Sequence, residues 1–144
     1  MSIETSKNVL QIAGLLRVIG AVYSLFWSII SIIGGGTAAL GSVIESDPLL
    51  QQSVGPMLAT GFISLPFSVY ALVEGFVCRR AGKSGRRRIA ALAMLMTAVS
   101  TAISILCQFL FVSRRLDTFS TIYSAVYCLV ILFSANVIRR KGEA

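Results

Sequence analysis

The sequence contains no histidine, and this absence removes several classes of function. Without imidazole the chain has no histidine zinc site, no bis-histidine haem ligation and no histidine general base. Only 6 of the 144 residues are acidic, and no two of them stand at a spacing that would form a carboxylate pair within a membrane. We therefore expect the chain not to be an enzyme and to hold no metal or other cofactor.

Cysteine is also scarce, with 3 residues in the chain. Cys78, Cys107 and Cys128 fall at different levels of the helices proposed below, so their Cα atoms are too far apart for a disulfide. We expect three free thiols that behave as small apolar side chains.

Charged residues are also few, because they make up only 13% of the chain while 56% of the residues are hydrophobic. A soluble domain carries about 25% charged residues. Four stretches of 21 residues or more contain no Asp, Glu, Lys or Arg, namely Val18–Ile44, Pro48–Val73, Ile89–Ser113 and Thr118–Ile138. A helix crosses a bilayer core with about 20 apolar residues. The sequence therefore predicts an all-α integral membrane four-helix (tetraspan) bundle, a single domain over residues 1–144 with spans at roughly 10–34, 54–78, 88–112 and 118–138.

The basic residues are placed unevenly, and their placement predicts the orientation of the chain. The segment between the second and third spans has six of them, the first loop has Glu45 and Asp47 without any base, and the third loop has only Arg114 and Arg115. Basic residues in short loops mark the cytoplasmic side. We expect both termini to face the cytoplasm (N-in/C-in), in a multi-pass protein of the plasma membrane, the inner membrane of a prokaryote. The six residues are Arg79, Arg80, Lys83, Arg86, Arg87 and Arg88.

The same basic cluster predicts attraction to anionic lipid headgroups, in addition to its role in orientation. It does not predict nucleic-acid binding, because no aromatic residues alternate with the basic ones and no folded platform would present them. The expected partners are the lipid bilayer, its anionic headgroups, and a second copy of the chain or another membrane protein.

The first apolar stretch leaves the position of its helix open. Val18–Ile33 alone is too short to cross before the glycines that begin at Gly34. Either the helix enters near Leu10, which places Arg17 inside the membrane, or it continues past the glycines to about Leu40. In the second arrangement Arg17 lies near the headgroups, and its aliphatic side chain extends so that the guanidinium reaches them.

The loop after this helix contains residues typical of a helix start. Asp47 can cap a helix and Pro48 suits its first position. Residues 47–53 are therefore predicted either as a short extracellular helix or as an early start of the second span.

Small side chains recur at helical spacing on the first and third spans and predict helix packing. Close backbone approach through small residues is a common way for helices to associate in lipid. The first span offers Gly20, Ser24 and Ser28, and the third offers Ala93, Thr97 and Thr101.

Arg17 and Glu74 are the two ionisable residues predicted to lie within the membrane. Such residues are costly to bury and are candidates for function. The predicted topology puts both in the cytoplasmic third at similar depth, so we expect them to pair. The pair would either only neutralise two charges or take part in gating or substrate binding. On the second span Pro66 predicts a kink, and Tyr70 lies one turn beyond it.

Two functions fit these features. The favoured one is a non-catalytic accessory, scaffold or assembly subunit that packs through its small-residue faces. The alternative is a small dimeric transporter or channel whose pathway uses Arg17, Glu74, Tyr70 and the Pro66 kink.

Overall fold

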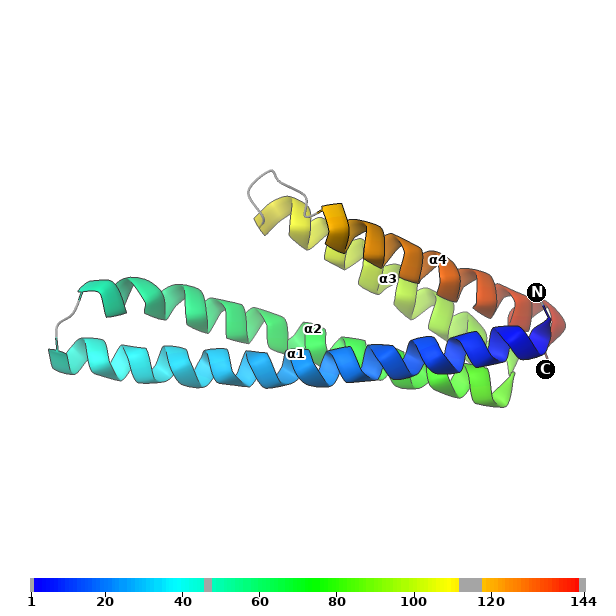
Figure 1. Ribbon diagram of the computed structural model, residues 1–144, viewed down its shortest axis with the longest axis horizontal. Helices are drawn as coiled ribbons and strands as arrows, with labels where there is room; N and C mark the ends of the chain where they lie inside the picture. The colour runs from blue at the N-terminus through cyan, green and yellow to red at the C-terminus, as the bar shows by residue number, and fades with distance from the viewer. Residues whose placement is uncertain (1, 46–47, 112–117, 143–144) are drawn as a thin grey trace. The chain divides into compact units, whose positions relative to one another are not determined.

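The computed structural model describes residues 2–45, 48–111 and 118–142, and these residues form four α-helices (Figure 1). They are α1 (Ile3–Glu45), α2 (Pro48–Ser84), α3 (Arg87–Phe111) and α4 (Thr118–Lys141). Each contains a stretch that is long and apolar enough to cross a membrane. The predicted all-helical fold with four apolar helices is confirmed. Of the loop residues used for orientation, Asp47, Arg114 and Arg115 lie outside the described residues.

The predicted spans fall on the four helices, with residue 112 outside the described part, but the helices begin and end elsewhere. α1 is continuous through the three glycines after Ile33, and the part of it that qualifies as a candidate membrane span by length and composition is Ile3–Gly41, 39 residues. That is far more than a bilayer requires, so length alone does not fix where α1 would enter a membrane. α2 begins at Pro48, so residues 48–53 are its first turns and no separate short helix forms there.

Local chemistry accounts for the helix ends. The Ser2 hydroxyl accepts a hydrogen bond from the Thr5 backbone N–H at 3.1 Å, and this satisfies one of the free donors at the start of α1. Pro48 occupies the first position of α2, where a missing N–H costs nothing. α4 ends in Arg139, Arg140 and Lys141, whose charges complement the negative end of the helix dipole.

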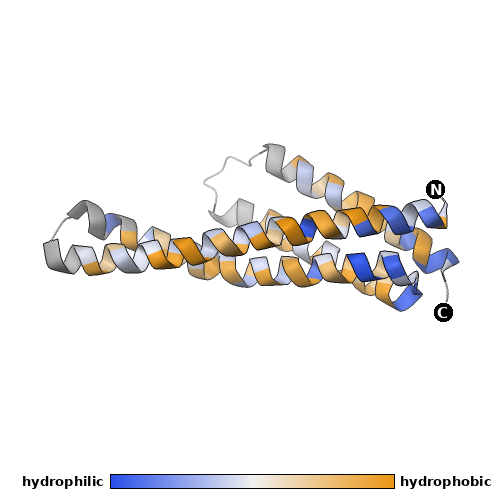
Figure 2. Ribbon diagram, turned by 60° about the horizontal axis from the view of Figure 1, so that its bottom comes forward, coloured by the Kyte–Doolittle hydropathy of each residue, from blue (hydrophilic) through white to orange (hydrophobic). Residues whose placement is uncertain are grey.

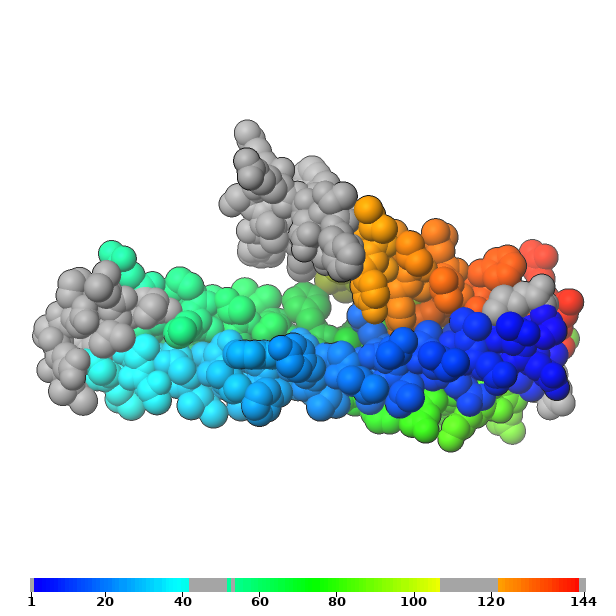
Figure 3. Space-filling view, viewed as in Figure 1, coloured from blue at the N-terminus to red at the C-terminus, as the bar shows by residue number. Residues whose placement is uncertain are grey.

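The chain forms two compact units. Unit 1 consists of Met1–Val18 and Val73–Ala144, and unit 2 consists of Ile19–Leu72. Unit 2 therefore holds the second part of α1 and the first part of α2, whose side chains meet in Figure 3.

In unit 2 the two helices pack antiparallel through residues with little or no side chain. A Cβ at Gly61 would lie 3.0 Å from the backbone nitrogen of Ile32, and one at Gly35 would lie 3.1 Å from that of Leu58. Such distances leave no room for a methyl group, so these glycines set how closely the backbones approach. Of the three glycines at 34–36, Gly35 thus lies on the contact face, whereas a Cβ at Gly34 or Gly36 would meet nothing within 4 Å.

Unit 2 also contains two hydrogen bonds between hydroxyls of the two helices. Ser24 bonds to Ser68 at 2.6 Å, and Ser28 bonds to Ser64 at 2.7 Å. Ser28 and Ser68 are almost fully buried. The predicted packing face at Ser24 and Ser28 is thus part of this contact.

Small residues recur every seven positions along both helices. On α1 they are Gly14, Ala21, Ser28 and Gly35, and on α2 they are Gly61, Ser68, Gly75 and Gly82. A seven-residue repeat keeps one face of a helix turned toward a partner as the two wind around each other. All eight residues are buried.

In unit 1 the first part of α1 and the end of α2 make the same kind of contact. A Cβ at Gly14 would lie 2.7 Å from the carbonyl oxygen of Gly75, and one at Gly82 would lie 2.6 Å from that of Lys7. α3 and α4 run side by side in this unit (Figure 1). The buried core here is also built mainly from small residues: Leu10, Ala13, Cys78, Ala81, Ala90, Ala93, Ile131, Ala135 and Ile138.

The outward faces of the helices are apolar. Large exposed side chains include Phe26 and Trp27 on α1, Phe62 on α2, Leu95 on α3 and Phe133 on α4, each at least half exposed. Figure 2 shows hydrophobic residues along most of the helices and hydrophilic ones at the end that holds both chain termini. Exposed apolar side chains in this number are compatible with helices that cross a membrane.

Candidate functional site

The most unusual group of side chains in unit 1 is an ion pair between α1 and α2. Nη2 and Nε of Arg17 donate to Oε2 of Glu74 at 3.0 and 3.2 Å. Glu74 is completely buried, whereas the Arg17 side chain is 32% exposed. The two residues that the sequence predicts to pair are therefore in contact, and the carboxylate is the more enclosed partner.

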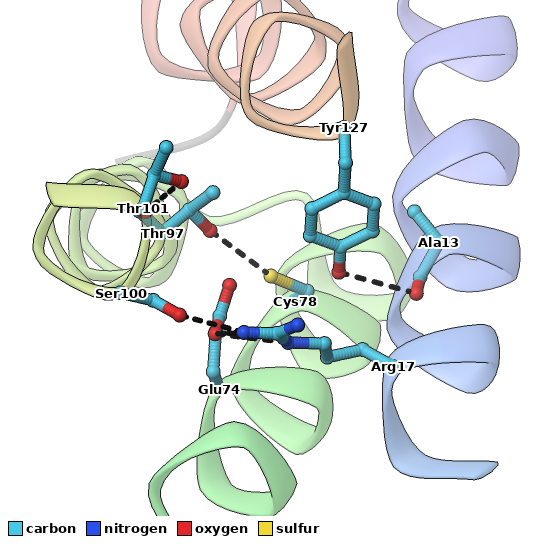
Figure 4. A network of polar contacts seen from close by, with 8 residues as sticks. All are labelled: Ala13, Arg17, Glu74, Cys78, Thr97, Ser100, Thr101 and Tyr127. Atoms are coloured by element: carbon cyan, nitrogen blue, oxygen red, sulfur yellow. Dashed lines mark hydrogen bonds and ion pairs between the residues drawn. The ribbon is translucent and has the colours of Figure 1, made fainter. Parts of the chain in front are cut away.

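α3 and α4 each add one side chain to the pair, as Figure 4 shows. Nη2 of Arg17 also donates to the Ser100 hydroxyl at 2.6 Å. The Arg17 guanidinium carbon lies 5.5 Å from the centre of the Tyr127 ring, within the range of a cation–π interaction. The Tyr127 hydroxyl donates to the Ala13 carbonyl at 3.4 Å. We call Arg17, Glu74, Ser100 and Tyr127 the polar node, since each of the four helices supplies one of its members.

The second carboxylate oxygen of Glu74 is left without a partner. Among the described side chains, Oε1 of Glu74 is the buried polar atom that forms no hydrogen bond. In Figure 4 it points toward Cys78 and Thr97, whose Sγ and Oγ1 atoms lie 3.9 Å apart. Both of these residues are fully buried. An unsatisfied buried acceptor costs about 1–3 kcal/mol, more when it is charged, so Oε1 is a place where one further donor would be stabilised.

Helical spacing brings these residues together. Gly14 and Gly75 let the backbones of α1 and α2 touch, and Arg17 and Glu74 lie within one turn of that contact. Thr97 and Ser100 lie three residues apart on α3, so their side chains are neighbours on its surface and Thr97 lies beside the node. The close approach of the backbones is thus what brings the two charges into contact.

The node offers hydrogen bonding and charge, but no ligand set for a metal. Within the described ranges, no group of three or more Cys, Asp or Glu side chains could hold a metal ion. Its chemistry is that of one buried carboxylate, one guanidinium with donors to spare, and hydroxyl groups. Comparison of the chain with protein-family models, curated proteins and solved structures finds no match.

The remaining predicted site residues lie elsewhere or act differently. Pro66 is exposed and Tyr70 half-buried, and both belong to unit 2. Gly20, predicted as a packing residue, is exposed, and a Cβ there would meet nothing within 4 Å. Its place on the contact face is taken by Ala21, which follows the seven-residue repeat. Gly20 therefore lies off the contact between α1 and α2, because four-residue spacing drifts off a seven-residue contact face, and its packing role stays a prediction.

The predicted small residues of α3 are placed as follows. Ala93 and Thr97 are fully buried in unit 1. Thr101 is half-buried, and its hydroxyl donates to the Thr97 carbonyl of its own helix at 2.9 Å. Cys78 and Cys128 are free thiols, as expected, and the side chain of Cys107 lies outside the described part.

Several contact residues were not found by sequence reasoning. Ser64 and Ser68 were missed although they lie four residues apart on the second span, which is a readable signal of one face. Gly14, Gly75 and Gly82 could have been found from the seven-residue repeat. Ser100 and Tyr127 carried no distinguishing signal, because hydroxyl residues are frequent on the third and fourth spans.

Proposed function

We propose that the chain is a small tetraspan integral membrane protein with a non-catalytic accessory or assembly role, and with both termini in the cytoplasm. The proposal rests on where polar and apolar side chains lie, with polar groups between the helices and large apolar side chains on the outer surface. Polar groups on the apolar helices bond to other helices of the same chain, as at the polar node and at the Ser24–Ser68 and Ser28–Ser64 contacts. Large apolar side chains occupy the outside. This arrangement supports a packing role, in which the outer surfaces of the helices meet lipid and other membrane proteins.

Orientation is tested by labelling single cysteines in cells. The three native cysteines are replaced by serine, and Lys83→Cys and Asp47→Cys are introduced separately. We expect an impermeant maleimide to modify Asp47→Cys in intact cells, and Lys83→Cys only after the membrane is opened. Modification of Lys83→Cys in intact cells would contradict the orientation.

The assembly role is tested by the size of the purified protein. Extracted in mild detergent and weighed by native mass spectrometry, the chain should occur in complexes that contain a second copy or another membrane protein. A population made up of single chains with lipid alone would remove this part of the proposal.

One observation favours the alternative, a small transporter or channel. Oε1 of Glu74 is buried without a partner, and a transported cation or proton would supply the missing contact. Cysteines placed in turn along α2 from Pro66 to Val77 distinguish the two functions. In an assembly subunit, a water-soluble maleimide should fail to reach the positions around Glu74 from either side. In a transporter it should reach them from both sides.

A further inference from the structure

The end of unit 1 that holds both chain termini is strongly basic. Ten of the 13 basic residues lie at this end, on the first turns of α1, the end of α2, the start of α3 and the end of α4. Eight are exposed, while Lys7 and Arg79 are half-buried. Figure 2 shows this end as the main hydrophilic region of the molecule. The ten residues are Lys7, Arg79, Arg80, Lys83, Arg86, Arg87, Arg88, Arg139, Arg140 and Lys141. We call them the basic end.

The positive charges of the basic end are not neutralised by the rest of the described chain. None of the ten side chains forms an ion pair with another described residue. The described acidic residue that shares this end is Glu4, in the first turn of α1. Glu143, which follows in sequence, lies outside the described residues. An uncompensated cluster of this size produces a positive potential that attracts multivalent anions.

Two of the cations are held at one defined point, the turn between α2 and α3. Gly85 makes this turn with φ of +63°, a conformation that favours glycine. A Cβ at Gly85 would lie 2.8 Å from Nζ of Lys7, so the ammonium group of α1 lies against the turn. On its other side, Nε of Arg87 donates to the Gly142 carbonyl at 2.7 Å. The turn thereby joins the beginning of α1, the start of α3 and the residue after α4.

Arg87 keeps its two terminal nitrogens after making this bond. Since Nε binds the protein, the guanidinium is held in a fixed direction with its remaining donors available. Guanidinium groups bind phosphate through paired hydrogen bonds, and fixing one in advance lowers the entropy lost on binding. Lys7 supplies a second positive charge at the same turn.

The position of the basic end along the helices indicates the source of the phosphate. The basic residues begin where the uncharged runs stop, because Arg139 directly follows the run that ends at Ile138 on α4, and Arg88 directly precedes the run that begins at Ile89 on α3. In a bilayer these residues lie where the hydrocarbon meets the headgroups. We propose that the basic end binds the phosphates of anionic phospholipids in the leaflet it faces, with Lys7 and Arg87 forming the contact at the turn. This inference rests on the membrane placement proposed above.

The test uses the full chain purified in a neutral detergent and given equal amounts of phosphatidylglycerol and phosphatidylcholine. Native mass spectrometry then counts the lipids that remain bound. The unchanged chain should retain phosphatidylglycerol in preference. Each basic residue near an anionic surface accounts for roughly fivefold in affinity, so Lys7→Gln with Arg87→Gln should reduce that preference roughly twenty-five-fold. The matched control is Arg114→Gln with Arg115→Gln, which removes the same charge elsewhere and should leave the preference unchanged. Circular dichroism of each variant verifies that its helices are intact.

Three results would overturn the inference. The first is equal retention of both lipids by the unchanged chain, and the second is equal loss in the two double variants. The third is displacement of the bound lipid by millimolar inorganic phosphate or by a soluble acidic peptide, which would show that the surface is not specific for lipid. Failure of the membrane placement is a separate outcome, because the chain would then stay in solution without any detergent.

Discussion

Removing one charge of the polar node should cost more than removing both. Glu74 is fully buried, so Arg17→Gln leaves a carboxylate without its cation in an apolar interior. Breaking a buried pair in this way costs about 3–5 kcal/mol. Because about a third of the Arg17 side chain is exposed to solvent, we expect a free-energy cost near the lower limit of this range, about 3 kcal/mol. Glu74→Gln should cost less, because the partly exposed Arg17 can turn its charge toward water or headgroups. The double variant should differ little from the parent.

Cys78 provides the assay, since it is fully buried beside the node and contacts Thr97. Cys107 and Cys128 are replaced by serine, and the rate of Cys78 modification by N-ethylmaleimide is measured in bicelles. Modification requires local opening, so the rate follows the opening free energy. A cost of about 3 kcal/mol corresponds to a rate increase of roughly a hundredfold for Arg17→Gln.

The parent and the double variant should be modified most slowly, Glu74→Gln faster, and Arg17→Gln fastest. Equal rates for the two single variants would refute the claim that burial of Glu74 sets the cost. A double variant that reacts as fast as, or faster than, Arg17→Gln would show that the two charges are not coupled.

Three further outcomes follow from the packing and the turn. Gly75→Ala should lower the thermal unfolding temperature in detergent, because the added Cβ would meet backbone atoms of α1 at about 3 Å and these cannot rotate away. Gly20→Ala, where the space is open, is its control and should be neutral or should stabilise by up to about 1 kcal/mol through helix propensity. Ser28→Ala should cost only about 0.6 kcal/mol in a denaturant titration, the usual value for hydrogen bonds between membrane helices, and a cost above about 2 kcal/mol would contradict this. Gly85→Ala should destabilise by about 1–2 kcal/mol because its φ is positive, and an unchanged unfolding temperature would exclude strain there.

The sequence was sufficient to predict the four helices, because residues without charge over such lengths fold as helices when lipid is the solvent. It was also sufficient to predict the partner of Arg17. Only Glu74 shares its depth in the predicted topology, and a buried charge requires an opposite one. Both inferences depend on position along a helix, which charge patterns reveal.

Rotation about each helix axis was harder to infer. Gly20 and Gly14 look alike in the sequence, and only Gly14 lies on the contact face. The distinction required the seven-residue repeat on both helices to be read together. Ser100 is one of several hydroxyl residues on the third span, and the rotation of α3 selects it as the partner of Arg17. Contacts of this kind depend on two helices at once, so no single stretch of sequence specifies them.

The polar node has a consequence for biosynthesis, given the bilayer placement proposed above. Its cation lies on α1 and its carboxylate on α2, which is synthesised later, so Arg17 emerges from the ribosome before its counter-ion. Stable entry should await the arrival of Glu74, with the first two helices partitioning as one hairpin. A nascent chain arrested just before position 74 should therefore remain with the insertion machinery or be degraded.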